Sequence, residues 1–308
     1  MPAHEESARI LSVAVDAIGG TPRSGQVEMA QAVDRAIDEE IHLLVQAGTG
    51  TGKSLGYLAP TIAHAVLDDE AVVVATATLA LQAQLADKDI PAALTAAEKV
   101  LPRRPRAAVL KGRHNHACLH KVRGGSSRPD QDMLLDDADS FAARSDGKGT
   151  DQASELGAEV VALRQWAEQQ AEANGIGDRD DGPAHSQQAW DQVSMRANEC
   201  LGAQNCPFGP QCLAERARER ARDADIVVTN HAMLAIDAMN GGTLLPEHDV
   251  VVIDEAHEVA DRFTGAASVD LWPGRLSTVA RQGLTWLDDD LGADLLDQVD
   301  VLHEALEV

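Results

Sequence analysis

Short apolar runs alternate with amphipathic stretches along much of this chain. Three runs, at residues 41–46, 71–76 and 250–253, have the length of a strand and are mostly apolar. Such runs are typical of parallel strands that helices cover on both faces. Residues 5–18 and 23–37 instead repeat apolar side chains at a helical period. The pattern therefore predicts an α/β fold built on a parallel sheet.

Further helices are predicted between and after these strands. Helical repeats occur after Ser54, behind Thr78, after Ala256 and at residues 155–173, 216–222 and 285–308. Pro60 lies inside the first of them and deletes one backbone hydrogen bond, so a kink is expected there. Residues 124–154, by contrast, are rich in Gly, Ser and Asp and have little apolar period, which predicts a long mobile loop.

A glycine-rich loop, within the stretch VQAGTGTGKSLGYL, follows the first apolar run. Gly48, Gly50 and Gly52 allow the backbone to turn its amides toward an anion, and the next helix adds the positive end of its dipole. Lys53 supplies charge for the β- and γ-phosphates, and the Ser54 hydroxyl can hold Mg²⁺. The alternative is a glycine-rich surface turn. The Lys-Ser pair favours a phosphate-binding loop, because it stands where that chemistry requires it.

Two adjacent carboxylates follow the last apolar run. An unpaired buried charge is costly, so Asp254 and Glu255 need a partner. Mg²⁺ supplies one: Asp254 can hold the metal, while Glu255 orients and deprotonates the water that attacks the γ-phosphate. The alternative is a helix start that favours acids. Beside a phosphate loop, the metal interpretation makes Lys53, Asp254 and Glu255 the predicted catalytic residues.

Three polar side chains near the loop have two interpretations each. Gln26, near the start of its helix, either meets solvent or reads the adenine edge through paired donor and acceptor groups. Thr76 and Thr78 follow the second apolar run, at the end of the strand where ligands of open α/β sheets lie. Their hydroxyls either meet a ligand or cap the helix behind them.

A long insertion separates the two motifs. About 200 residues lie between Lys53 and Asp254, too many for one crossover connection. Residues 103–128 hold eight Lys or Arg and no acid, whereas residues 130–181 hold fourteen acids and four bases. The basic stretch either contacts nucleic acid phosphates or pairs with the acids of the same chain. The insertion shows few apolar residues, so we expect a bound metal to order residues 106–214.

The insertion contains all four cysteines, spaced C-x81-C-x5-C-x5-C. Three of them, Cys200, Cys206 and Cys212, cluster among Gly and Pro, which with Cys118 predicts a four-thiolate metal site. Zinc sites usually contain C-x2-4-C pairs, which are missing here, and the wider spacings leave room for an iron–sulfur cube. Unrelated buried cysteines are the alternative.

Composition limits the class of protein. The chain has 308 residues, with 26 Lys and Arg against 50 Asp and Glu, and a formal net charge of −24. This balance argues against a protein that is basic throughout, but nucleic acid binding depends on where the positive charge lies. The first 30 residues contain no secretory signal, and no run of about 18 apolar residues occurs, which predicts a cytoplasmic protein without a transmembrane helix.

The motifs in their order resemble the bacterial DinG branch of the XPD-like, iron–sulfur-containing superfamily 2 DNA helicases. The resemblance covers roughly residues 20–265, and the order of the motifs is more specific than any one of them. The similar segments are Arg23 and Gln26 (Q motif), Ala47 to Ser54 (motif I), Thr76 to Gln84 (motif Ia), KGRHNHAC at 111–118, VVTNHAML at 227–234 and Asp254 to His257 (DEAH box).

The resemblance implies a fold and a set of cofactors. The fold is a P-loop RecA-like parallel sheet with an inserted four-cysteine iron–sulfur domain and the start of a helical Arch domain. The cofactors are ATP, Mg²⁺ and a [4Fe-4S] cluster. The implied segments are 1–105 and 214–265 for the RecA-like domain, 106–213 for the cluster domain and 266–308 for the Arch-like start.

Sequence and resemblance together predict the site residues. They are Arg23, Gln26, Ala47, Gly48, Thr49, Gly50, Thr51, Gly52, Lys53 and Ser54 for ATP; Ser54 and Asp254 for Mg²⁺; Cys118, Cys200, Cys206 and Cys212 for the cluster; Thr78, Lys111, Arg113, Lys121 and Arg123 for DNA; and His257 for coupling.

The resemblance implies a monomeric, ATP-driven 5′ to 3′ helicase that moves on single-stranded DNA. The chain resembles the amino-terminal part of such a protein, without the second RecA-like domain that brings an arginine to the ATP. Residues 1–308 alone are therefore expected to bind Mg-ATP weakly, to hydrolyse it at most marginally and not to unwind DNA. Two alternatives stay open: a module that binds nucleotide and single-stranded DNA without turnover, and an unrelated P-loop enzyme with a structural zinc site.

Overall fold

The computed structural model describes residues 3–17, 19–21, 23–48, 51–124, 150–268, 273–284 and 286–306. The chain divides into two compact units, residues 1–263 and 264–308. The strands are β1 (Val72–Thr76), β2 (Ala107–Val109), β3 (Ile226–Asn230) and β4 (Val250–Ile253). The α-helices are α1 (Ala3–Ala17), α2 (Ser24–Asp38), α3 (Lys53–Leu67), α4 (Leu79–Gln84), α5 (Ile90–Ala97), α6 (Leu119–Val122), α9 (Thr150–Glu172), α10 (Gln187–Val193), α11 (Leu213–Arg222), α12 (His231–Met239), α13 (Val259–Ala267), α14 (Pro273–Gly283) and α15 (Asp289–Leu306).

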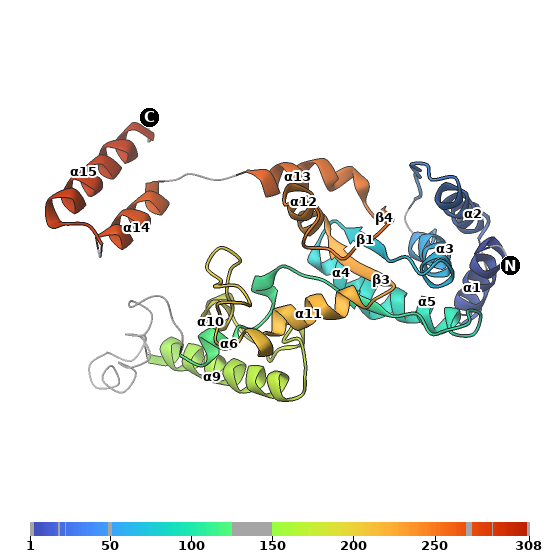
Figure 1. The fold of residues 1–308 in the computed structure, drawn as a ribbon, viewed down its shortest axis with the longest axis horizontal. Helices are drawn as coiled ribbons and strands as arrows, with labels where there is room; N and C mark the ends of the chain where they lie inside the picture. The colour runs from blue at the N-terminus through green and yellow to red at the C-terminus, as the bar shows by residue number, and fades with distance from the viewer. Residues whose placement is uncertain are drawn as a thin grey trace. The chain divides into compact units, whose positions relative to one another are not determined.

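A parallel sheet of four strands forms the centre of the first unit, in the order β2-β3-β1-β4 (Figure 1). Val72 of β1 is in register with Ile226 of β3 and with Val250 of β4. This register brings the carboxyl ends of the strands to one edge, where Asn230 ends β3 and Asp254 follows β4. The predicted α/β class with a parallel sheet is confirmed.

Helices cover both faces of this sheet. On one face, α1, α3 and α5 share a core with Val72 and Val74 of β1. On the other face, residues of α11 and α12 pack with Val73 of β1 and Val227 of β3. The pleat of a strand sends successive side chains to opposite faces, so a strand between two helical layers must be apolar at every position. This arrangement explains the unbroken VVV in β1.

Most predicted helices are confirmed. The helices expected at 5–18 and 23–37 are α1 and α2, and those expected at 155–173 and 216–222 lie within or overlap α9 and α11. Because α9 begins at Thr150, the last residues of the predicted mobile loop are helical, and residues 125–149 lie outside the described residues. No helix in the described part of the chain is long and apolar enough to cross a membrane.

The strand predicted at residues 41–46 is wrong for this structure. Residues 41–48 form no regular element, and Leu44 is 94% exposed. An apolar run becomes a buried strand only where a neighbouring strand pairs with it and helices cover it. Among the described strands, β4 is one of the two edges of the sheet, and its Val251 and Ile253 are 39% and 37% exposed. The prediction that β4 is fully buried is therefore also wrong.

The insertion leaves the sheet after β2 and returns through α11 to β3, which pairs with β2. It has an apolar core of its own, in which Trp190 of α10 and Leu163 of α9 are fully buried. Trp190 Nε1 also donates a hydrogen bond of 2.7 Å to the carbonyl of His114. The expectation that the insertion lacks an apolar core is therefore wrong, since α6, α9 and α10 supply one.

The second unit is helical, as the leucine spacing at 285–308 predicts. Helices α14 and α15 pack against each other, and they bury Ala280 and Val299. Several apolar side chains of this unit remain exposed, including Trp286 at 80%. Its identity as the start of an Arch domain, like the boundaries drawn at 105, 213 and 265, stays a prediction.

Candidate nucleotide site and cysteine pocket

Gly52 connects the glycine-rich loop to α3. Its φ of +80° is a left-handed conformation that glycine adopts without strain. The Gly52 carbonyl accepts a hydrogen bond of 3.0 Å from Gln26 Nε2, and a Cβ at Gly52 would lie only 2.4 Å from that nitrogen. Gln26 is buried and Arg23 beside it is exposed. Gln26 thus holds the end of the loop, a contact that neither of its two predicted roles includes.

The remaining loop positions are described in part. Thr51 Oγ1 donates a hydrogen bond of 2.8 Å to the carbonyl of Gly48. Ala47 is half-buried, and Thr49 and Gly50 lie outside the described residues. The role of this loop in ATP binding stays a prediction.

The two motifs that the sequence analysis predicts to be catalytic meet through Lys53 and Glu255, which are 202 positions apart in the chain. Lys53 Nζ donates to Glu255 Oε1 at 2.6 Å. This hydrogen bond raises the pKa of Lys53 and lowers the pKa of Glu255, so both groups stay charged. Their side chains are 25% and 32% exposed. A pair this open to water adds little to stability, and an incoming anion can displace the carboxylate from the lysine.

Glu255 also has an uncommon backbone conformation. Its φ is +53°, in the left-handed region, at the point where β4 ends and the 3₁₀ turn Ala256–Glu258 begins. For a residue with a Cβ, this conformation costs about 1–2 kcal/mol relative to the right-handed one. Such strain occurs mainly where the surrounding structure requires a special side-chain position.

Asp254 is fixed at both carboxylate oxygens and along its backbone. Oδ1 accepts from the Glu255 amide at 3.1 Å, and Oδ2 accepts from the Tyr57 hydroxyl at 3.3 Å. The Asp254 amide donates to the carbonyl of Ala75 at 2.9 Å. Its carbonyl lies 2.9 Å from Nε2 of His231. A carboxylate fixed in this way presents its free lone pairs in one orientation, which suits a metal ligand.

Two histidines flank the acidic pair in different environments. His231, the first residue of α12, is fully buried, and burial lowers its pKa. The neutral ring can donate from Nε2 to the Asp254 carbonyl, an assignment that follows from the acceptor. His257 is 72% exposed, with Nδ1 3.6 Å from Glu255 Oε2. Its predicted coupling role stays a prediction.

Thr78 caps α4, which confirms one of its two interpretations. Its Oγ1 accepts a hydrogen bond of 3.2 Å from the Leu81 amide. The hydroxyl of Thr76 donates to the Thr78 carbonyl at 3.1 Å. The predicted contact of Thr78 with DNA is not tested by this geometry and stays a prediction.

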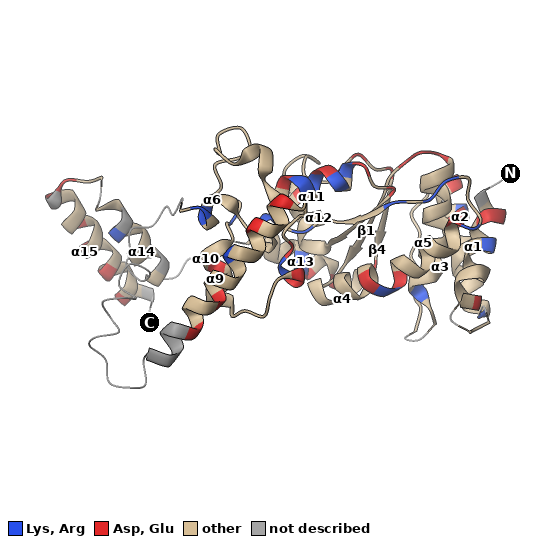
Figure 2. Cartoon of the chain, turned by 90° about the horizontal axis from the view of Figure 1, so that it is seen from below, with Lys and Arg blue, Asp and Glu red and all other residues tan. Residues whose placement is uncertain are grey.

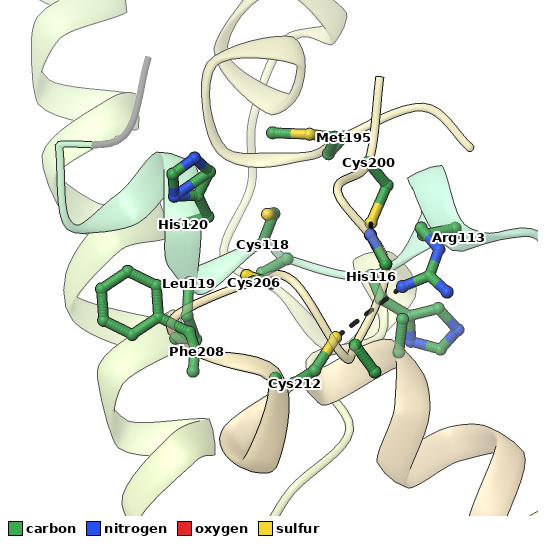
Figure 3. A pocket seen from close by; sticks show the side chains of 15 residues that line it. Arg113, His116, Cys118, Leu119, His120, Met195, Cys200, Cys206, Phe208 and Cys212 are labelled. Carbon is green, nitrogen blue, oxygen red and sulfur yellow. Dashed lines mark hydrogen bonds between the residues drawn. The ribbon is translucent and has the colours of Figure 1, made fainter. Parts of the chain in front are cut away.

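The four cysteines line one pocket, although Cys118 lies far from the other three in sequence (Figure 3). All four are free thiols and half-buried. Arg113, His116, His120, Met195 and Phe208 share the lining, which contains no carboxylate. Four thiols without a carboxylate form a donor set that suits a soft metal.

Backbone hydrogen bonds hold Cys118 at this pocket. Its amide donates to the carbonyl of Val193 at 2.7 Å, and the amide of Ala117 donates to the carbonyl of Gly177 at 2.9 Å. Burial raises the pKa of the Cys118 thiol, and the other cysteines add to this effect. Thiolates crowded together need a positive partner, and a bound metal would supply one.

Some positive charge already faces the sulfurs. Arg113 Nη1 lies 3.8 Å from Cys212 Sγ, and the Gly202 amide donates to Cys200 Sγ at 3.4 Å. Among the residues the structure describes, no three His, Cys, Asp or Glu converge closely enough to hold one metal ion. The pocket therefore gathers the predicted ligands without arranging a site for a single ion.

Lys111 and Arg113, two predicted phosphate contacts, are engaged inside the protein. Lys111 Nζ lies 2.7 Å from Asp178 and 2.7 Å from Asp180, and its side chain is 6% exposed. Burial alone would lower the pKa of Lys111, but these carboxylates outweigh it and raise the pKa. Arg113 pairs with Glu215 at 2.5 Å. For these two residues the geometry favours the alternative interpretation, in which the basic stretch pairs with acids of the same chain.

Lys121 and Arg123 lie closer to the surface of the insertion. Lys121 Nζ donates to the Asp191 carbonyl at 2.9 Å. Arg123 pairs with Glu168 at 2.7 Å, lies 5.0 Å from the centre of the Phe208 ring and is 31% exposed. Acidic and basic residues also mix along α11, as Figure 2 shows. The phosphate contacts of Lys121 and Arg123 stay predictions.

Sequence reasoning gave no role to Tyr57 or His231. Tyr57 stands four positions after Lys53, so the two side chains share one face of α3, and this spacing was a usable signal. His231 directly follows β3, at the edge of the sheet where ligands of α/β folds lie. Their contacts with Asp254 depend on the pairing of β1 with β4, which the sequence does not reveal.

Together, the parallel sheet, the glycine-rich loop before α3 and the acidic pair after β4 are typical of P-loop α/β domains. The family model described as DEAD_2 matches residues 185–276. The chain is 47% identical over 274 residues to the ATP-dependent helicase DinG of Mycobacterium tuberculosis strain H37Ra, a match that covers 89% of this chain. It is 35% identical over 249 residues to the ATP-dependent DNA helicase YoaA of Escherichia coli K12, which covers 79%.

The chain is therefore similar to DinG- and YoaA-type ATP-dependent helicases, the family that the motifs resemble. Another similar protein is the ATP-dependent DNA helicase DinG of Photobacterium profundum, at 31% identity over 264 residues, or 80% of this chain. The matches cover only 40% of the Mycobacterium relative and 34% of the Escherichia and Photobacterium relatives.

Proposed function

We propose that this chain forms the ATP-binding part of an ATP-dependent DNA helicase of the iron–sulfur type. The observation that carries the proposal is the contact of Lys53 with Glu255 beside Asp254. A phosphate-binding lysine, a metal-binding aspartate and a water-activating glutamate are the parts that phosphoryl transfer requires. The names of the relatives support DNA as the nucleic acid along which the helicase moves. The resemblance suggests movement from 5′ to 3′ on a single strand.

The nucleotide would change the partner of Lys53. In the proposed cycle, Lys53 leaves Glu255 and binds the β- and γ-phosphates, while Gln26 and Arg23 face the base. Ser54 and Asp254 hold Mg²⁺, which neutralises phosphate charge when bound. Glu255, released from the lysine, then accepts the proton of the attacking water.

Nucleotide affinity tests this proposal directly. Titration of the 1–308 chain with a fluorescent ATP analogue and Mg²⁺ should show saturable binding, and Lys53→Ala should abolish it. Lys99→Ala is the matched control, because Lys99 is an exposed lysine near the end of α5. Equal binding by the Lys53→Ala and Lys99→Ala variants would overturn the proposal.

A second variant separates binding from chemistry. Glu255→Gln keeps the shape of the side chain but removes the base, so nucleotide should still bind while any hydrolysis is lost. The same change frees Lys53 from its carboxylate, so binding should be equal to or tighter than that of the unchanged chain. Loss of binding in Glu255→Gln would argue that the glutamate supports the loop rather than the chemistry.

The proposal includes a [4Fe-4S] cluster held by Cys118, Cys200, Cys206 and Cys212. The shared pocket and its carboxylate-free lining support this assignment. A cluster spreads its thiolates over several iron atoms, so it does not require three sulfurs to converge on one point. Anaerobically purified protein should contain iron and sulfide, and Cys206→Ser should lose both while retaining nucleotide binding. Stoichiometric zinc without sulfide would contradict the cluster.

Single-stranded DNA is the proposed partner of the insertion. Lys121 and Arg123 are the favoured phosphate contacts, because the side chains of Lys111 and Arg113 are only 6% and 11% exposed in their ion pairs, whereas that of Arg123 is 31% exposed beside Glu168. Each phosphate contact releases counterions, so affinity should fall steeply as salt rises.

A further inference from the structure

Tyr57 lies one helical turn after Lys53 on α3, beside the predicted metal ligand Asp254. Its side chain is 2% exposed, and the ring belongs to the core shared by α1, α3 and α5. Its hydroxyl donates to Asp254 Oδ2 at 3.3 Å. A hydroxyl on the helix that follows the phosphate loop thus contacts a predicted metal ligand of the acidic motif.

The tyrosine is well suited to hold this carboxylate in place. An aromatic ring packed in a core has only two side-chain dihedrals, and both are limited by its neighbours. Asp254 Oδ1 is already occupied by the Glu255 amide, so the bond to Tyr57 decides how the second oxygen is oriented. Without that bond, the carboxylate could turn about its last dihedral at little cost.

A simpler explanation is that a buried hydroxyl has merely found acceptors. Thr61 shows what that case looks like in the same helix. Its hydroxyl donates to the backbone carbonyls of Tyr57 and Leu58, and its side chain is fully buried. The hydroxyl of Tyr57, by contrast, donates to a side chain of a separate motif, the carboxylate of Asp254.

We infer that Tyr57 is a positioning residue, which holds Asp254 so that Mg²⁺ and nucleotide bind together. This inference rests on the proposed function of the loop and the acidic pair. Side chains that orient metal ligands typically change metal affinity about 10- to 100-fold when they are replaced. Tyr57 acts on a ligand, so its loss should be seen in the metal dependence and not in the fold.

The test is the Mg²⁺ dependence of nucleotide binding by the 1–308 chain and its Tyr57→Phe variant. A fluorescent ADP analogue is titrated at a series of Mg²⁺ concentrations and in EDTA. Tyr57→Phe should raise the Mg²⁺ concentration at half-maximal binding by about tenfold or more. Affinity in EDTA and the thermal unfolding midpoint should stay close to those of the unchanged chain, because the ring remains in the core.

Thr61→Val is the matched control, since it removes a buried hydroxyl from the same helix without touching Asp254. It should leave the Mg²⁺ midpoint unchanged. In an Asp254→Asn background, Tyr57→Phe should add little, because the group that it orients is already altered. An unchanged midpoint in Tyr57→Phe, or an equal shift in Thr61→Val, would overturn the inference.

The Lys53→Ala variant distinguishes the two levels of the proposal. If Lys53→Ala abolishes binding while Tyr57→Phe leaves the Mg²⁺ midpoint unchanged, the nucleotide site stands and only the role of Tyr57 is wrong. If Lys53→Ala binds as well as the unchanged chain, the proposed function itself is wrong, and the inference about Tyr57 fails with it.

Discussion

Lys53 and Lys111 each face carboxylates at nearly the same distance, but they lie in different surroundings. Lys53 is 2.6 Å from Glu255 at the end of the glycine-rich loop, and its side chain is 25% exposed. Lys111 is 2.7 Å from Asp178 and from Asp180, where the insertion joins the sheet, and its side chain is 6% exposed. Neither the sequence nor the N–O distances distinguish these two ion pairs.

Burial makes the two pairs differ in how easily they separate. Water screens the Lys53 pair, so its separation costs little and a phosphate can replace the carboxylate. The Lys111 pair is largely withdrawn from water, so removal of one partner leaves an uncompensated charge in a medium of low dielectric constant. The same chemistry therefore serves as an exchangeable contact at the loop and as a fixed contact at the insertion.

The largest expected effect follows from breaking the buried pair. Lys111→Met should destabilise the protein by about 3–5 kcal/mol, because Asp178 would remain buried without its cation. Denaturant unfolding followed by tryptophan fluorescence measures this change, since Trp190 lies in the core of the insertion. Lys121→Met is the control, as it removes a lysine of the same segment that lies nearer the surface. A loss below about 1 kcal/mol would show that water reaches the pair.

Breaking the exposed pair should change stability little and nucleotide binding strongly. Lys53→Ala should change the free energy of unfolding by less than about 1 kcal/mol, even though nucleotide binding is expected to disappear. The same unfolding experiment measures it, with Lys99→Ala as the matched control. A loss as large as that of Lys111→Met would mean that the two pairs do not differ in the way their burial indicates.

The sequence predicted the chemistry of the glycine-rich loop and the acidic pair better than that of Lys111. The glycine-rich loop and the acidic pair could be identified because phosphate and metal binding restrict residue type and spacing. The role of Lys111 could not, since a basic residue looks the same whether it meets DNA or Asp178. The failed strand at 41–46 has a similar cause: an apolar run specifies that burial is favourable, but the partner that buries it lies elsewhere in the chain.

Arg123 tests the intermediate case of an exposed cation that already has a partner. Arg123→Glu should weaken single-stranded DNA binding and reduce the salt dependence of the affinity by about one unit in the logarithmic slope. Lys99→Glu has the same change in net charge outside the insertion and should leave that slope unchanged. Fluorescence anisotropy over a range of salt concentrations measures both. An unaltered slope in Arg123→Glu would reject the phosphate contact.

The smallest expected effect concerns pH and His114, an exposed residue of the insertion. Partial loss of water around its ring, followed by the charges of Arg179 and Arg196, lowers the pKa of His114. The unfolded chain then takes up a proton near pH 6.5 that the folded chain does not, so stability should fall as pH decreases below about 7. His114→Gln should make this decline shallower. The control is His42→Gln, at another exposed histidine that lies outside the insertion, and it should leave the decline unchanged. Unfolding midpoints measured between pH 7 and pH 5 distinguish these outcomes.

The left-handed backbone conformation of Glu255 implies a trade-off between activity and stability. Glycine would adopt this conformation without a steric penalty, so a Glu255→Gly chain would be relieved of about 1–2 kcal/mol of strain. That chain would also lack the carboxylate on which the proposed hydrolysis depends. Selection for stability alone would thus tend to replace this glutamate. Selection for activity must act to retain it.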